Sequence, residues 1–273
     1  MIIIKRMIIY LSLIFFCNSC ALILNFQDLP KPEGPYYIGT EIFTWEDTYR
    51  DEWFTKDKID TRKIVVQIWY PASEPSDSLH PYMDYSNLRI QSISDRIDKG
   101  KGFIKPAANV KTNTYYNATP MNEKFPLILF SHGLGGYKTQ NLINIEALVS
   151  QGYIVVAPDH TYDATITIFE DGTTVEFEAG LPGDITPDEF WNNRIPQINT
   201  RASDISFIID KLQAMKDYKL YNAIDFNKIG IFGHSFGGAT SVVSAWNDTR
   251  ISACLNLDGW FVPIVNEIIN TGL

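Results

Sequence analysis

The stretch IGIFGHSFGGATSVV, residues 229–243, decides the fold. An apolar run leads into the pattern Gly-x-Ser-x-Gly, and a run of small residues follows it. This is the pattern of a nucleophile elbow, in which a serine stands on a sharp turn between a strand and a helix. Gly233 and Gly237 flank Ser235, because so tight a turn leaves no room for side chains beside it. We therefore predict that Ser235 is a catalytic nucleophile.

Outward from this stretch, strand and helix patterns alternate. Continuous apolar or β-branched runs predict further strands at residues 62–72, 126–130, 153–160 and 251–258. Helical spacing of apolar residues predicts helices at 88–97, 141–152 and 199–215. Residues 166–177 alternate around Asp171-Gly172 and predict a β-hairpin. This rhythm indicates an α/β fold, with a mostly parallel sheet covered by helices on both faces.

Two further features suit the chemistry of a serine nucleophile. SHGLGG, residues 131–136, follows an apolar strand, which is where such folds supply one oxyanion-hole amide. We predict the backbone N–H groups of Leu134 and Phe236 as the two donors; a simple tight turn is the alternative. Asp258 ends the strand that follows the elbow helix, so it is the candidate acid of a Ser-His-Asp triad. The alternative for Asp258 is a turn or helix-capping residue.

Five segments in this order carry a resemblance to a known family: IWYP, FSHGLGG, GYIVVAPDH, GHSFGGAT and LDGW. Together they resemble the platelet-activating factor acetylhydrolase family of plasma or bacterial type, within the α/β-hydrolase superfamily. The likeness runs from about residue 34 to the end of the chain. It implies that Ser235 is the nucleophile, Asp258 the triad acid, and Leu134 and Phe236 the oxyanion donors. It also implies cleavage of short acyl chains from glycerophospholipids, with no metal or other cofactor.

A triad histidine is the missing element. The histidines of the chain are His80, His132, His160 and His234, and none follows Ser235. In the family that the chain resembles, the histidine comes some tens of residues after the aspartate. We therefore expect a C-terminal truncation, in which residues 34–273 form an α/β-hydrolase domain without its final strands. Such a chain would be poorly active and marginally stable, and it would expose an apolar sheet edge. His160 and, less favourably, His132 are the candidates for a substitute base.

The N-terminus has the pattern of a bacterial export signal. Lys5 and Arg6 precede an apolar run at residues 7–16, and a small residue stands before Cys20. We predict a signal peptide over residues 1–19, lipid attachment at Cys20, and a linker over 20–33. A plain secreted protein and an uncleaved anchor are the alternatives. A lipoprotein would lie in the bacterial cell envelope, and a plain secreted protein would lie outside the cell.

Charge and cysteine content exclude some classes of partner and site. A net charge of −9 leaves no basic face for a nucleic acid. Apart from Cys20, the predicted site of lipid attachment, Cys254 is the one cysteine after the predicted signal, so no internal disulfide or cysteine metal site is expected, and its apolar run predicts a buried thiol. Arg201 and Asp204 are expected to form a structural ion pair. The leading hypothesis is an esterase of short-acyl phospholipids. The alternatives are a cutinase-like or dienelactone-hydrolase-like esterase and a non-catalytic, membrane-anchored binding protein.

Overall fold

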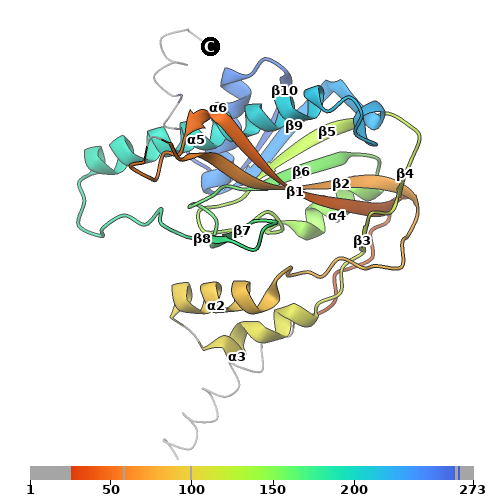
Figure 1. Cartoon of the computed structure of the whole chain (residues 1–273), viewed down its shortest axis with the longest axis horizontal. Coiled ribbons are helices and arrows are strands. Elements are labelled where there is room, and N and C mark those ends of the chain that lie inside the picture. Colours follow the sequence, from red (N-terminus) through yellow and green to blue (C-terminus); the bar gives the residue numbers. More distant parts are fainter. Residues whose placement is uncertain (1–25, 58, 99, 262–263, 265–273) are drawn as a thin grey trace, which may run out of the picture. The chain divides into compact units, whose positions relative to one another are not determined.

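The computed structural model describes residues 26–57, 59–98, 100–261 and 264 (Figure 1). The predicted signal peptide, the acylation of Cys20 and the first part of the linker lie outside these residues. No helix in the described ranges is both long and apolar enough to span a bilayer. The chain divides into two compact units, one formed by the residues up to Leu29 with Pro81–Thr112, the other by Pro30–His80 with the residues from Asn113 onward. The predicted domain limits at residues 20–33 and 34–273 stay predictions.

The smaller unit is helical. It contains α2 (Ser86–Ile97), α3 (Lys101–Ile104) and the 3₁₀ helix η1 (Lys105–Asn109). Met83, Ile90 and Ala107 form its small buried core. The helix predicted at residues 88–97 is therefore confirmed, although it begins two residues earlier.

The larger unit is built on an eight-stranded sheet, in which β10-β9-β5-β6-β2-β1-β3 are neighbours in that order and β4 pairs with β2. The strands are β1 (Tyr37–Asp51), β2 (Thr61–Glu74), β3 (Thr114–Tyr116), β4 (Thr119–Pro120), β5 (Phe125–Ser131), β6 (Ile154–Asp159), β9 (Ile224–His234) and β10 (Ile251–Leu257). Strands β6, β5, β9 and β10 run parallel to one another. Strand β2 is antiparallel to its neighbours β1, β4 and β6. The predicted strands are thus present, and the part of the sheet that carries the elbow is parallel.

Helices cover both faces of this sheet, as predicted. Helix α6 (Phe236–Asn247) packs on β9, β10 and β5 and also contacts α5 (Pro187–Ala214). Helix α4 (Leu142–Ser150) contacts β2, β6 and β1, and Figure 1 shows it on the other side of the sheet. The buried side chains of α5 that pack on the sheet are the predicted ones, namely Ile205, Ile208, Ile209 and Leu212. Burying each of these side chains contributes roughly 2 kcal/mol to stability.

Helix α5 is longer than the sequence pattern indicates. The prediction placed its start at residue 199, but it begins at Pro187. The Thr186 side chain accepts a hydrogen bond from the Glu189 backbone N–H at 3.2 Å, and Glu189 accepts one from the Thr186 N–H at 2.8 Å. This capping box starts the helix upstream of Pro196, a residue that usually ends one.

The predicted hairpin is confirmed. Strands β7 (Ile166–Ile168) and β8 (Thr174–Glu176) pair antiparallel as a separate two-stranded sheet. Gly172 lies between them with a φ of 83°, a left-handed conformation that glycine adopts without strain.

The prediction of a buried Cys254 is wrong, because β10 is an edge strand. Within the described part of the chain, β10 pairs only with β9, and its residues 252–255 are exposed. Leu255 is 57% exposed. An apolar groove of about 750 Å³ runs alongside, lined among others by Ile128, Leu148 and Tyr153. The expected apolar sheet edge is therefore present in the structure.

Candidate active site

Ser235 lies on a strained turn between β9 and α6. Its φ of 53° and ψ of −119° are unusual for a residue with a side chain. A Cβ atom at Gly233 would lie 2.1 Å from the carbonyl oxygen of Gly237, and one at Gly237 would lie 2.0 Å from that of Ser131. Both positions therefore require glycine, as the elbow pattern predicts. The turn holds its serine at the carboxyl end of the sheet.

Strand register brings the predicted site residues to one edge of the sheet. Ser131 of β5 pairs with Gly233 of β9, so the turn after β5 lies beside the elbow. Leu257 of β10 pairs with His234, and its carbonyl oxygen accepts a hydrogen bond from the Ser235 N–H at 2.7 Å. Leu134, Ser235, Phe236 and Asp258 therefore follow the ends of three adjacent strands.

The two predicted oxyanion donors lie on segments that are in contact. Phe236 is the first residue of α6, and an N–H at that position has no acceptor within the helix. The positive end of the helix dipole is at the same place. The Leu134 side chain packs against the buried cluster that contains Phe236 and Ala239. The arrangement suits an oxyanion hole, and the roles of the two amides stay predictions.

Asp258 follows β10 directly and is exposed. Its backbone has a φ of 62°, and its neighbours hold it in place. The Gly259 N–H donates to Asn256 Oδ1 at 2.7 Å, and Asn256 Nδ2 donates to the Gly259 carbonyl at 3.1 Å. Among the residues that the structure describes, none forms a hydrogen bond with the Asp258 carboxylate or with Ser235 Oγ. The carboxylate is thus open to a further partner.

His160 does not serve as a base for Ser235, because both of its ring nitrogens are engaged elsewhere. Nδ1 lies 2.8 Å from Asp204 Oδ2, and Nε2 lies 3.1 Å from the hydroxyl of Ser131. These three side chains have the order of a Ser-His-Asp triad, but all are 0% exposed, so no substrate reaches them. Burial, followed by the nearby Arg201 charge, lowers the pKa of His160 to about 3, so the ring is neutral.

His132 is also engaged. Its Nδ1–H donates to the Gly133 carbonyl at 2.7 Å, and Nε2 accepts from the His160 backbone N–H at 3.1 Å. Burial holds the pKa of His132 well below its ordinary value. The His80 ring contacts Gln67 and Tyr116 elsewhere in the sheet.

His234 is the remaining histidine, and it precedes the nucleophile in the chain. Its Nδ1 has no hydrogen-bond partner within the described ranges. The same nitrogen lies 3.3 Å from the position that a Cβ atom of Gly133 would occupy, so the ring borders the oxyanion turn.

A buried network of charges lies behind the elbow, and sequence reasoning missed it. Asp204 accepts hydrogen bonds from Arg62 at 2.7 and 3.0 Å and from Arg50 at 2.9 Å. Burial alone would raise the pKa of Asp204, but Arg62 and His160 hold it well below its ordinary value. The predicted Arg201–Asp204 pair is wrong: Arg201 Nε instead lies 4.0 Å from Asp163 Oδ2. The Asp204 carboxylate instead accepts hydrogen bonds from Arg50 and Arg62, which are far away in the sequence. The periodicity of the sequence does not predict such long-range contacts.

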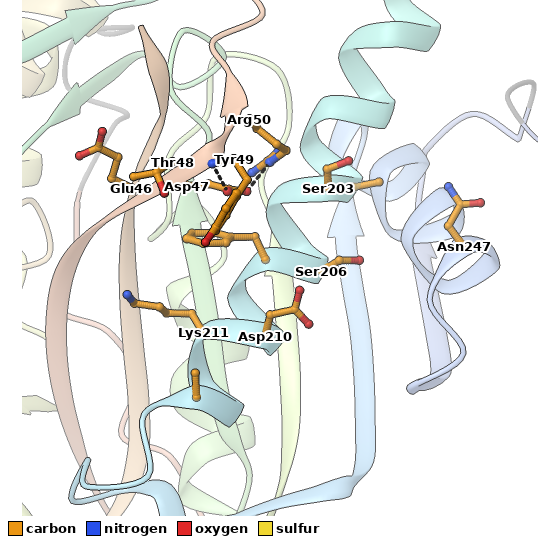
Figure 2. Close-up of a pocket in the computed structure, with 13 residues that line it drawn as sticks. Glu46, Asp47, Thr48, Tyr49, Arg50, Ser203, Ser206, Asp210, Lys211 and Asn247 are labelled. Carbon is orange, nitrogen blue, oxygen red and sulfur yellow. Dashed lines mark hydrogen bonds and ion pairs between the residues drawn. The ribbon is translucent and has the colours of Figure 1, made fainter. Parts of the chain in front are cut away.

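A groove beside α5 is a second hollow, and Figure 2 shows it. It has a volume of about 610 Å³ and lies between β1 residues such as Tyr49 and Arg50 and α5 residues such as Ser206 and Lys211. Arg50 bonds Asp47 within β1, as the dashed lines show. None of the four predicted site residues lines this groove, so it is separate from the elbow.

Aromatic rings gather next to the elbow. Trp260 lies 6.0 Å from the Phe236 ring, 5.5 Å from Phe190 and 5.2 Å from Trp191, all edge to face. Trp260 is 41% exposed. These rings form an apolar wall next to Phe236, the residue that follows the serine. In the described ranges, no three His, Cys, Asp or Glu side chains are grouped so as to hold a metal ion.

Comparisons with known proteins agree with one another. The sequence model of the family "Platelet-activating factor acetylhydrolase, isoform II" matches residues 23–271. The platelet-activating factor acetylhydrolase of Bos taurus is 34% identical over 265 residues, which cover 88% of this chain and 57% of the relative. The probable 1-alkyl-2-acetylglycerophosphocholine esterase of Arthroderma benhamiae is 28% identical, with 90% of this chain and 61% of the relative covered. The chain thus spans about three fifths of the length of these relatives.

Among solved structures, a ferulic acid esterase from Streptomyces cinnamoneus superposes with a TM-score of 0.70 at 27% identity. The superposition covers 86% of this chain and 62% of the esterase. It agrees with the mostly parallel sheet and its two helical layers, and it supports the α/β-hydrolase fold that the resemblance implied.

Proposed function

Because the chain belongs to the platelet-activating factor acetylhydrolase family, isoform II, we propose that it is a serine hydrolase that removes a short acyl group from a phospholipid. The observation that carries this proposal is the elbow. A strained serine stands next to two backbone segments whose amides suit an oxyanion, and an open carboxylate follows the neighbouring strand.

The chemistry follows from this arrangement. Ser235 Oγ attacks the ester carbonyl, and its proton passes to a base. The carbonyl oxygen becomes an oxyanion, which the N–H groups of Leu134 and Phe236 stabilise by about 3 kcal/mol for each donor. The tetrahedral intermediate collapses, the base protonates the departing alcohol, and water then hydrolyses the acyl-serine. In a complete Ser-His-Asp triad, the role of Asp258 is to orient the imidazole that acts as this base.

The base is the part of the mechanism that His132 and His160 do not supply, since their ring nitrogens are hydrogen-bonded away from Ser235. A missing triad base lowers turnover by roughly 10⁴-fold or more. We therefore expect the 273-residue chain to turn over slowly but to retain an acylatable serine.

The test is ester hydrolysis with a ladder of acyl lengths. The purified chain is given glycerophosphocholines with acetyl, butyryl and palmitoyl groups at position 2, and the released acid is measured over hours. Slow release that is fastest for acetyl and disappears in Ser235→Ala supports the proposal. Equal release by Ser235→Ala, or a preference for palmitoyl, contradicts it.

A second candidate is an esterase of aromatic acids. The aromatic wall of Phe190, Trp191 and Trp260 stands beside the elbow, and the ferulic acid esterase has the same fold. Adding methyl ferulate to the substrate ladder separates the two candidates. A higher kcat/KM for methyl ferulate than for the acetyl phospholipid would favour this second candidate.

A non-catalytic binding protein is the third candidate, because no histidine in the described ranges forms a hydrogen bond with Ser235. It predicts that the chain binds a short-acyl phospholipid without releasing acid, even when the serine is intact. Acid release that depends on Ser235 would exclude it.

For the cell, we propose export and lipid attachment at Cys20. The basic and apolar N-terminal segments and the position of Cys20 support this proposal. When the gene is expressed in a bacterium, labelled palmitate should enter the protein and should not enter Cys20→Ser. Equal labelling of both proteins, or of neither, would contradict it.

A further inference from the structure

One buried arginine contacts both segments that supply the oxyanion amides. Arg201 of α5 is 0% exposed. Its Nη2 donates to the Ser131 hydroxyl at 3.1 Å and to the carbonyl oxygen of His132. Its Cζ atom also lies 5.1 Å from the centre of the Phe236 ring. The guanidinium thus links the turn after β5 to the first residue of α6.

The contact with His132 bears on the direction of the Leu134 N–H. In a trans peptide, the N–H of one residue points opposite to the carbonyl of the residue before it. The Gly133 carbonyl is held by His132 Nδ1–H at 2.7 Å and by the Gly136 N–H at 2.9 Å. The Leu134 N–H therefore points to the opposite side, and His132 is the residue whose ring fixes it. Arg201 in turn holds the main chain of His132.

The energetics of this site favour a role beyond packing. In the part of the chain that the structure describes, Nε and Nη1 of Arg201 have no hydrogen-bond acceptor, and the nearest carboxylate oxygen, on Asp163, is 4.0 Å from Nε. Burial lowers the pKa of Arg201 to about 10, so it keeps its charge at neutral pH. An apolar residue of similar volume is often as stable as a buried charge with weak pairing. Stability alone therefore does not explain the arginine.

We propose that Arg201 is a positioning residue that keeps the Leu134 and Phe236 amides in register for the oxyanion. This inference rests on the proposed ester hydrolysis and names a residue that acts through the turn, without touching the substrate. Loss of the guanidinium should leave substrate binding intact and disturb the two donors.

The first measurement does not depend on activity. Hydrogen exchange by mass spectrometry is compared for the full chain, Arg201→Met and Arg194→Met. Arg194 is the matched control: it lies on the same helix, with Cζ 5.7 Å from the Phe236 ring, and bonds Ala179 and Gln197 instead of the turn. Faster exchange at residues 133–136 in Arg201→Met, with no change there in Arg194→Met, supports the inference. Unchanged exchange in Arg201→Met, or equal changes in both variants, would overturn it.

The second measurement is kinetic. Arg201→Met should lower kcat by about a hundredfold, the effect of losing one well-placed oxyanion donor, and change KM less than threefold. Arg201→Lys, which keeps a donor for the His132 carbonyl, should recover part of the loss. A loss confined to KM, or a lysine variant no better than methionine, would overturn the inference. If Arg201→Met fails to fold, the double variant Arg201→Met with Asp163→Asn, which leaves no buried unpaired carboxylate, takes its place.

The two proposals can fail separately. If the unmodified chain releases no acid from any ester, the proposed function fails, and the exchange measurement still decides whether Arg201 orders the turn. If the chain is active and Arg201→Met retains its kcat, the positioning role fails and the proposed function stands.

Discussion

At the scale of single residues, the backbone at the elbow leaves least freedom. Gly237 lies against the carbonyl oxygens of Ser131 and His132, which belong to the main chain and cannot move aside as a flexible side chain would. Gly237→Ala should therefore lower the free energy of unfolding by more than about 2 kcal/mol, measured by urea denaturation. Gly183→Ala is the control, since a Cβ there meets no atom within 4 Å. Equal stability of the two variants would contradict the steric account of the elbow.

His160 predicts a pH dependence of stability. Its pKa is about 3 in the folded protein, lowered by burial, against an ordinary value near 6.5. As the pH falls below about 6.5, the unfolded chain takes up a proton that the folded protein refuses, so stability is lost progressively down to pH 3. Burial raises the pKa of Asp163 to about 6, and this group works in the opposite direction between about pH 4 and 6.

Comparison with His160→Asn isolates the histidine, because Asp163 is present in both proteins. At pH 8 the variant should be less stable than the unmodified protein, because the substitution weakens the contact with Asp204. Between pH 8 and pH 5, the free energy of unfolding of the variant should fall by about 2 kcal/mol less than that of the unmodified protein. Urea unfolding at the two pH values measures both quantities. Parallel losses in the two proteins would show that His160 is not a buried neutral ring.

At the scale of elements, the start of α5 depends on its capping box. Thr186→Ala removes the side-chain oxygen that accepts the Glu189 N–H and should lower the free energy of unfolding by about 1 kcal/mol. Thr186→Ser keeps the oxygen and should change the free energy of unfolding by only about 0.3 kcal/mol. If alanine and serine behave alike, the helix does not start at this cap.

The elements also show what the sequence could predict. Strands β5 and β6 and the second half of β9 are largely buried on both faces, so their apolar runs are continuous and easily recognised. Strand β1 was not predicted, because its 15 residues mix buried and exposed positions and include Glu46, Asp47 and Arg50. Its pairing with β2 is a long-range contact that local pattern does not reveal.

The site divides in the same way. Ser235, Leu134, Phe236 and Asp258 follow from local motifs and from the rule that parallel strands end at one edge. The contacts of His160 and Arg201 depend on how α5 packs over the sheet, so their spacing in the sequence carries no signal. The exposure of Cys254 on β10 could not be predicted either, since an apolar run has the same sequence pattern at the edge of a sheet and in its centre.

At the scale of the whole molecule, the edge of the large sheet should govern association. Within residues 26–261 as the structure describes them, strand β10 pairs on one side only, and it presents Leu255, 57% exposed, beside an apolar groove. Such a strand edge is a site for pairing with another chain. The 273-residue chain should therefore elute from a sizing column as dimers or larger species at micromolar concentration. Leu255→Lys should shift it toward the monomer. A monomeric parent chain, or an unchanged profile for the variant, would contradict this.

From the family match, the sheet order and the elbow, we infer that the whole molecule presents a single hydroxyl for acylation, at the carboxyl edge of the sheet. The most direct test is to incubate the chain with a fluorophosphonate for several hours and to locate the adduct by peptide mass spectrometry. We predict one adduct, on Ser235, which is absent from Ser235→Ala. An adduct on another serine such as the buried Ser131, or a parent chain that stays unmodified under conditions that label a known serine esterase, would contradict the claim.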